Sequence, residues 1–127
     1  MSAYERISAT AEPAAIVAAV RAELAGRAIT EYAVVDHGHD MAVAGSPGHV
    51  AWTLVFGSPA GGARLLDRDP AAAVDIPLRL AVIGAPGGGS EIVIRDMASL
   101  LAPDLAELAS AFTALLREIA AAVSARA

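Results

Sequence analysis

The sequence predicts an α+β domain in which two helices pack on one face of an antiparallel sheet. Two apolar segments, 50–56 and 78–83, have the length and residue types of buried strands, and a turn-rich segment separates them. By contrast, the apolar residues of segment 103–124 recur every three or four positions, as they do along one face of a helix. Together with the shorter segments described next, this gives the order β-α-β(4)-α.

The N-terminal part of the chain predicts a strand, a helix and a second strand. The first strand is expected over 4–7. Apolar residues four positions apart predict an amphipathic helix over 13–25, with Pro13 suited to its first position and Gly26 to the residue after its end. The β-branched segment 29–35 predicts the second strand.

The middle of the chain predicts a central strand between two irregular segments. Residues 38–49 are expected to form an irregular loop. In strand 50–56 the alternating residues carry no charge on either face, so we expect this strand in the middle of the sheet with both faces covered. Gly61 and Gly62 predict a turn, and short helical turns are expected over 63–74.

The C-terminal part predicts a hairpin and the long helix. The proline after Ile76 keeps that residue extended, and strand 78–83 follows. A glycine-rich connection over 85–90 leads to the partner strand 91–95. The helix over 103–124 is about 33 Å long at 1.5 Å per residue, which is enough to cross the whole sheet.

Composition limits the possible functions of this chain. Its 127 residues suit a single domain, 1–127, and 56% of them are apolar. The net charge of −5 argues against nucleic-acid partners, which need clustered cations. Without cysteine, disulfides, thiolate metal sites and thiol catalysis are excluded.

The N-terminal segment lacks the pattern of a secretory signal, because Glu5, Arg6 and Glu12 interrupt it. Uninterrupted apolar runs are also much shorter than the roughly 20 residues that span a bilayer. We therefore expect a soluble, cytoplasmic protein with no membrane partner.

Four short motifs resemble those of a known family. They are A-V-V-D-H over 33–37, F-G-S-P-A-G-G over 56–62, A-V-D-I-P-L-R over 73–79 and R-D-M over 95–97. In order and spacing they are similar to A-V-I-D-H, F-G-N-P-x-x-G, A-L-D-L-P-L-R and N-D-P of the domain-of-unknown-function family number 302. The resemblance covers about residues 5–120. It implies a TATA-binding-protein-like fold and no particular reaction.

This chain departs from the family pattern at three places. Ser58 replaces the usual Asn, and Met97 replaces the usual Pro. The R-H-G-L segment that often follows the family's Asp is missing after Asp96. A chemical role of that histidine in relatives would therefore be lost here.

Segment 36–40, D-H-G-H-D, has three possible interpretations. Its two histidines would point the same way from a strand end and could bind a metal with Asp36, Asp40 or His49. Alternatively, Asp36 and His37 could act as a general acid/base pair, or Asp36 could simply end the strand by accepting backbone N–H bonds. Only Asp36 and His37 match the family resemblance, so we expect no metal and no cofactor.

The glycine-rich segment 57–62 could bind an anion through its backbone amides. It lacks the Lys-Ser/Thr ending of a nucleotide-binding loop. A tight turn around Gly57 and Pro59 is the interpretation we favour.

Arg79 is a charged residue inside an otherwise apolar strand, so it needs a partner. If Leu80 pairs with Ile94, Arg79 comes opposite Arg95, and the two cations would call for an external anion. A shift by one residue would place Arg79 opposite Asp96 instead. We favour an internal carboxylate partner, with these candidates: Asp75, Asp96 and Asp36.

The sheet face away from the helices is also expected to be apolar. Its expected residues are Ala51, Thr53, Val55, Ala81, Ile83 and Val93. An exposed apolar face of this size usually contacts another molecule, and a two-fold homodimer is the simplest case.

The sequence thus predicts a non-enzymatic homodimer that binds a small anionic molecule in one cleft. Two alternatives remain, an enzyme that uses His37 as general acid/base near Arg79 and a structural protein-interaction module. The expected ligand-binding residues are Asp36, His37, Gly57, Pro59, Asp75, Arg79 and Asp96.

Overall fold

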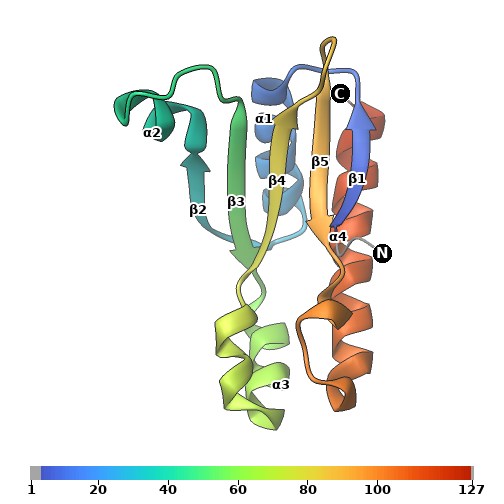
Figure 1. The fold of residues 1–127 in the computed structure, drawn as a ribbon. Coiled ribbons are helices and arrows are strands. Elements are labelled where there is room, and N and C mark those ends of the chain that lie inside the picture. The colour runs from blue at the N-terminus through green and yellow to red at the C-terminus, as the bar shows by residue number, and fades with distance from the viewer. Residues whose placement is uncertain (1–3, 127) are drawn as a thin grey trace.

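The computed structural model describes residues 4–126 and confirms the α+β prediction (Figure 1). Within these residues, five antiparallel strands form one sheet in the order β1-β5-β4-β3-β2. The strands are β1 (Tyr4–Ala9), β2 (Thr30–Asp36), β3 (Ala51–Gly57), β4 (Leu78–Gly84) and β5 (Ser90–Arg95). Two long helices, α1 (Pro13–Gly26) and α4 (Ala106–Arg126), cover one face of the sheet, as predicted.

The hydrophobic core lies between this face, which we call the covered face, and the two helices. Strand residues that point toward the helices are almost completely buried: Leu54, Phe56, Leu78, Leu80, Val82, Ile92 and Ile94. Opposite them, α1 contributes Ile16, Val20 and Leu24, and α4 contributes Leu116, Ile119 and Val123. Burying each of these side chains stabilises the fold by about 1.5–3 kcal/mol.

Helix α4 does not cross the sheet as expected from its length. It runs beside β1 and β5, and its N-terminal half continues beyond the end of the sheet, so α1 is needed to cover the other strands (Figure 1). From Pro103 to Arg126 the helix is long and apolar enough, on average, to span a membrane. Here, however, its apolar side packs in the core of the domain.

Ion pairs attach the polar side of α4 to the rest of the domain. Arg117 Nη2 lies 2.9 Å from Glu5 Oε1 of β1. The hydrogen bonds that Arg117 donates to Glu5 raise the pKa of Arg117 above its ordinary value. Near the other end, Arg126 Nη2 lies 2.7 Å from Glu23 Oε1 of α1.

Strand β3 lies inside the sheet, but only one of its faces is covered by α1 and α4. We call the opposite side of the sheet the open face. By their pairing, its residues on β3, β4 and β5 are Ala51, Thr53, Val55, Arg79, Ala81, Ile83, Glu91, Val93 and Arg95. None of these side chains is fully buried. The expectation that both faces of the central strand are covered is therefore wrong.

Two predicted irregular segments are in fact helices. Residues 38–49 do not begin as a loop, because α2 (His37–Val43) starts directly after β2. Its N-cap is Asp36, whose Oδ1 accepts a hydrogen bond from the backbone N–H of His39 at 3.0 Å. This confirms the interpretation that Asp36 ends the strand.

The turn expected at Gly61 and Gly62 is also wrong. Both residues lie in α3 (Pro59–Arg68), which begins with Ser58 as N-cap and Pro59 in the first turn. A short 3₁₀ helix, η1 (Pro70–Asp75), follows, in agreement with the helical turn expected there. Two further 3₁₀ turns, η2 (Met97–Ser99) and η3 (Pro103–Leu105), precede α4.

The hairpin between β4 and β5 is anchored to the start of α1. Gly89 has φ +76, and its N–H donates to Glu12 Oε1 at 3.2 Å. A side chain at Gly89 would meet the backbone oxygen of Ala9, which is 2.7 Å from an ideal Cβ. The buried Ser90 hydroxyl donates to the Ala11 carbonyl at 2.7 Å. These contacts fix the register that the glycine-rich sequence leaves open.

At the opposite edge of the sheet, β2 is mostly exposed and irregular. Its pairing with β3 shifts between Glu31 and Ala33, so Tyr32 forms a bulge. Glu31 points back toward the helices and forms an ion pair with Arg21 of α1 at 2.9 Å. This pair raises the pKa of Arg21, first through its hydrogen bond and then through the charge of Glu31.

Candidate functional site

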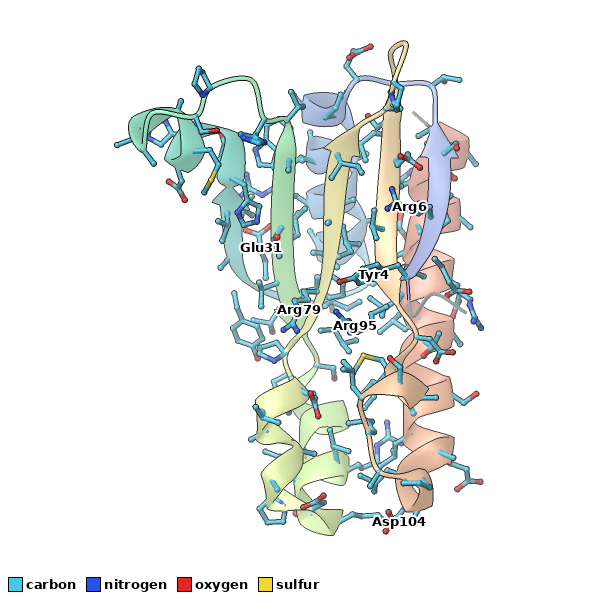
Figure 2. The ribbon with its side chains drawn as sticks, viewed as in Figure 1. Tyr4, Arg6, Glu31, Arg79, Arg95 and Asp104 are labelled. Carbon is cyan, nitrogen blue, oxygen red and sulfur yellow. The ribbon has the colours of Figure 1, made fainter. Side chains whose placement is uncertain are left out.

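The register of β4 and β5 brings two arginines together on the open face. Ala81 pairs with Val93, so Arg79 comes opposite Arg95 when the same register is extended by two residues. Figure 2 shows both side chains at the same end of the open face, near Tyr4. This is the first of the two predicted registers.

The internal carboxylate partner expected for Arg79 is not found. Among residues 4–126, no hydrogen bond or ion pair involves the Arg79 side chain. Asp36 caps α2, and Asp96 caps η2 by accepting from the N–H of Ala98 at 3.0 Å. Asp75 lines a small crevice beside both arginines but forms an ion pair with neither. The preferred prediction for Arg79 is therefore wrong, because Asp36 and Asp96 cap helices and Asp75 forms no ion pair with Arg79.

The two arginines border a hollow of about 170 Å³, which we call the arginine hollow. Ala81 and Val93 contribute apolar surface to it, and Thr53 and Tyr4 contribute hydroxyl groups. Arg95 Nη2 donates to Tyr4 Oη at 3.1 Å, and the Arg95 guanidinium lies 4.9 Å from the centre of the Tyr4 ring. Tyr4 thus holds one guanidinium in place without neutralising its charge.

His37 lies near the arginine hollow without lining it. Its Nε2 is 2.7 Å from Thr53 Oγ1, and Thr53 in turn lines the hollow. Since His37 and His39 lie two positions apart on a helix, they cannot point the same way as they would from a strand. His49 Nε2 instead lies 3.0 Å from Ser46 Oγ. Among residues 4–126, no three side chains of His, Cys, Asp or Glu meet to form a metal-ligand group.

The segments 56–62 and 73–79 meet at a second cavity of about 280 Å³, which we call the apolar cavity. Gly57 and Pro59 line it, together with Phe112 and Leu115 of α4. Its lining residues Gly57, Ser58 and Pro59 lie where β3 continues into α3. Helix α3 itself lies beyond the end of the sheet (Figure 1).

The predicted site residues are therefore distributed over separate places. Arg79 is at the arginine hollow, Gly57 and Pro59 at the apolar cavity, and His37 behind Thr53. The structure does not bring them into one cleft. Two residues of the arginine hollow, Tyr4 and Thr53, were not among the predicted site residues, because their proximity depends on the order of the strands.

The five-stranded sheet with its two helices defines an α+β domain of the β-α-β(4)-α type. Residues 5–125 match the family described as "Domain of unknown function DUF302", and the chain belongs to this family.

Among solved structures, the chain is similar to the crystal structure of an uncharacterized conserved protein DUF302 from Bacillus stearothermophilus, with a TM-score of 0.83. That likeness covers 99% of this chain and 98% of the other at 15% identity, so it shows the fold alone. No curated protein matches the chain.

Proposed function

We propose that this domain binds a small anionic molecule in the arginine hollow. One observation carries the proposal: Arg79 and Arg95 stand opposite each other, and within residues 4–126 neither forms an ion pair with a carboxylate. Two neighbouring guanidinium groups repel each other, and an anion between them would replace this repulsion with attraction.

The chemistry of the arginine hollow suits a carboxylate or phosphate group. Guanidinium presents its N–H donors in a planar fork that matches the oxygens of such groups. Tyr4 and Thr53 add hydroxyl groups, while Ala81 and Val93 provide apolar contacts for the rest of a small ligand. Arg6 of the neighbouring strand β1, by contrast, has a carboxylate partner, since its Nη1 lies 3.5 Å from Glu91 Oε1.

Binding without catalysis is the function we propose. A general base must come within hydrogen-bond reach of the proton that it removes. His37 reaches the arginine hollow only through Thr53, and its Nε2 is already engaged there.

The test is a thermal-shift and calorimetry series with inorganic phosphate, acetate and citrate at low ionic strength. At least one anion should raise the melting temperature of the wild type. Both Arg79→Gln and Arg95→Gln should raise the dissociation constant of that anion about tenfold or more. This matches the loss of a charge-assisted hydrogen bond of about 1.5–3 kcal/mol.

Arg6→Gln is the matched control, because Arg6 lies in the neighbouring strand β1 but pairs with Glu91. It should leave anion binding unchanged. The proposal fails if the double variant Arg79→Gln/Arg95→Gln binds the same anions as tightly as the wild type, or if none of the three anions binds. His37→Gln should leave binding intact, whereas turnover of a bound anion that is lost in His37→Gln would support an enzyme instead.

We also propose that two copies associate through the apolar part of the open face. Val55 and Ile83 are only half-buried there, outside the lining of the arginine hollow, and exposed apolar surface favours association. Sedimentation equilibrium should give the mass of a dimer for the wild type and of a monomer for Ile83→Glu. A monomeric wild type would contradict this, and a larger mixed assembly in cells would support the interaction-module alternative.

We also propose that the protein is cytoplasmic, as expected from the sequence, and cell fractionation tests this location.

A further inference from the structure

We infer that the apolar cavity is a second binding site, separate from the arginine hollow, for a neutral and largely apolar molecule of about two fused rings. Its walls come from β2, α3, β4 and α4, so residues far apart in the sequence enclose it. Ligand pockets are typically concave, mostly apolar and lined by a few polar groups.

The size of the apolar cavity sets the size of the ligand. Its volume is about 280 Å³. In another protein, a cavity of about 150 Å³ lined by apolar side chains binds benzene. A bicyclic molecule is therefore a reasonable fit here, whereas a solvent molecule finds few polar partners.

The lining of the apolar cavity sets the chemistry of the ligand. None of the residues around it carries a charge. Its polar side-chain groups are the hydroxyls of Tyr32 and Ser58, and Ser58 Oγ already accepts from the N–H of Gly61 at 3.5 Å. The Ser58 hydroxyl can still donate its proton to a ligand oxygen. A charged ligand would find no compensating partner, so a neutral one is expected.

The glycine at position 62 leaves space in the cavity but lowers the stability of the helix that contains it. It lies inside α3, where glycine is less stable than alanine, and its φ is not in the left-handed region. An ideal Cβ there would have its nearest neighbour, Ile76 Cδ1, at 3.7 Å, which is an ordinary contact. Neither backbone conformation nor crowding requires glycine at this position. The missing side chain does leave more space in the cavity.

The experiment uses 6-fluoroindole, which is neutral and bicyclic, as a probe observed by ¹⁹F NMR with the full chain. Its signal should shift and broaden with the wild type, and unlabelled indole should reverse this change. Ala73→Leu places a larger side chain at the cavity wall and should raise the dissociation constant at least tenfold. Gly62→Leu should do the same from α3, so the conclusion does not depend on the folding of one variant.

Two controls distinguish binding in this cavity from non-specific binding to apolar surface and from binding at the proposed anion site. Ala63→Leu makes the same substitution at an exposed position of α3 outside the cavity lining and should leave binding unchanged. Arg79→Gln should also leave it unchanged, since Arg79 does not line the apolar cavity. The inference is overturned if 6-fluoroindole fails to bind the wild type, or if folded Ala73→Leu and Gly62→Leu bind it as tightly as the wild type does.

Discussion

The covered and open faces of this sheet are made by alternate residues of the same strands, yet they differ in burial and in the pairing of their charges. On the covered face, Leu54, Val82 and Ile92 are fully buried against α1 and α4. On the open face, none of the residues of β3, β4 and β5 is fully buried. One face therefore supplies the folding free energy and leaves the other free to carry groups that stability does not require.

Charge follows much of the same division, with the Arg6–Glu91 ion pair on the open face as the exception. On the helix side, Glu23 pairs with both Arg27 and Arg126, at 2.6 and 2.7 Å. On the open face, Arg79 and Arg95 lie opposite each other and form no ion pair within the described chain. Paired charges connect elements of the fold, whereas unpaired charges remain available to a ligand.

Truncation of matched isoleucines should give the largest difference between the faces. Ile92 and Ile83 lie on adjacent strands, but Ile92 is fully buried on the covered face and Ile83 is half-buried on the open face. Ile92→Ala should lower the free energy of unfolding by about 2–5 kcal/mol, because it removes buried surface and leaves a cavity. Ile83→Ala should cost less than half as much. Urea denaturation of both variants, at a protein concentration too low for the proposed dimer, measures this, and equal losses would show that Ile83 is as deeply buried as Ile92 within one copy of the chain.

A smaller effect is expected for the polar residue buried behind the covered face. Thr113 of α4 accepts a hydrogen bond from the N–H of Met97 at 3.0 Å and is 2% exposed. Thr113→Val keeps the shape but leaves that buried N–H unpaired, so it should cost about 1–3 kcal/mol. Ser110→Ala, at an exposed position of the same helix, should be close to neutral. Thermal unfolding of both variants tests this, and a stable Thr113→Val protein would argue against the hydrogen bond.

Acid should lower the stability of the fold by protonating Glu23, which pairs with arginines on the helix side of the sheet. The hydrogen bond from Arg27, aided by the charge of Arg126, lowers the pKa of Glu23 below its ordinary value, although burial opposes this. A carboxyl with a lowered pKa in the folded state stabilises the fold above its unfolded pKa, and this stabilisation is lost as pH falls through the folded pKa.

The corresponding measurement is the melting temperature between about pH 5 and pH 3, where glutamate titrates. Glu23→Gln should reduce the decline of stability with acid relative to the wild type. Glu107→Gln, at an exposed position in the first turn of α4, should not. Parallel curves for wild type and Glu23→Gln would contradict the role of Glu23.

The smallest expected effect is on the open face itself. Arg79→Gln should change the free energy of unfolding by less than about 0.5 kcal/mol, as is usual for surface substitutions that break no specific contact. Chemical denaturation without added anions measures this. A loss of several kcal/mol would show that Arg79 has a structural partner in solution and that its charge is not free for a ligand.

The main elements could be predicted from the sequence because their apolar periodicity is strong. The alternation of Trp52, Leu54 and Phe56 with smaller residues correctly predicted a strand, whereas the expectation that both of its faces are covered was wrong. Short helices were missed where glycine suggested a turn. The pair Ser58-Pro59 is an N-cap followed by a first-turn proline, and this signal could have predicted α3 despite Gly61.

The candidate sites were harder to predict, because they depend on which strands are neighbours. Arg79 and Arg95 could be placed opposite each other only as one of two registers, since the hairpin between them contains three consecutive glycines. Tyr4 is 91 residues from Arg95 in sequence and reaches it because β1 pairs with β5. No local pattern in the chain contains that information.

The bulge at Tyr32 affects how copies of this protein behave when they are concentrated. A strand at the margin of a sheet exposes backbone amides that can template another chain, which is a common start of fibre growth. In β2 the ladder is interrupted between Glu31 and Ala33, so an incoming strand could not remain aligned along its whole length. The irregularity therefore disfavours edge-to-edge pairing at β2 while leaving the open face available for contact.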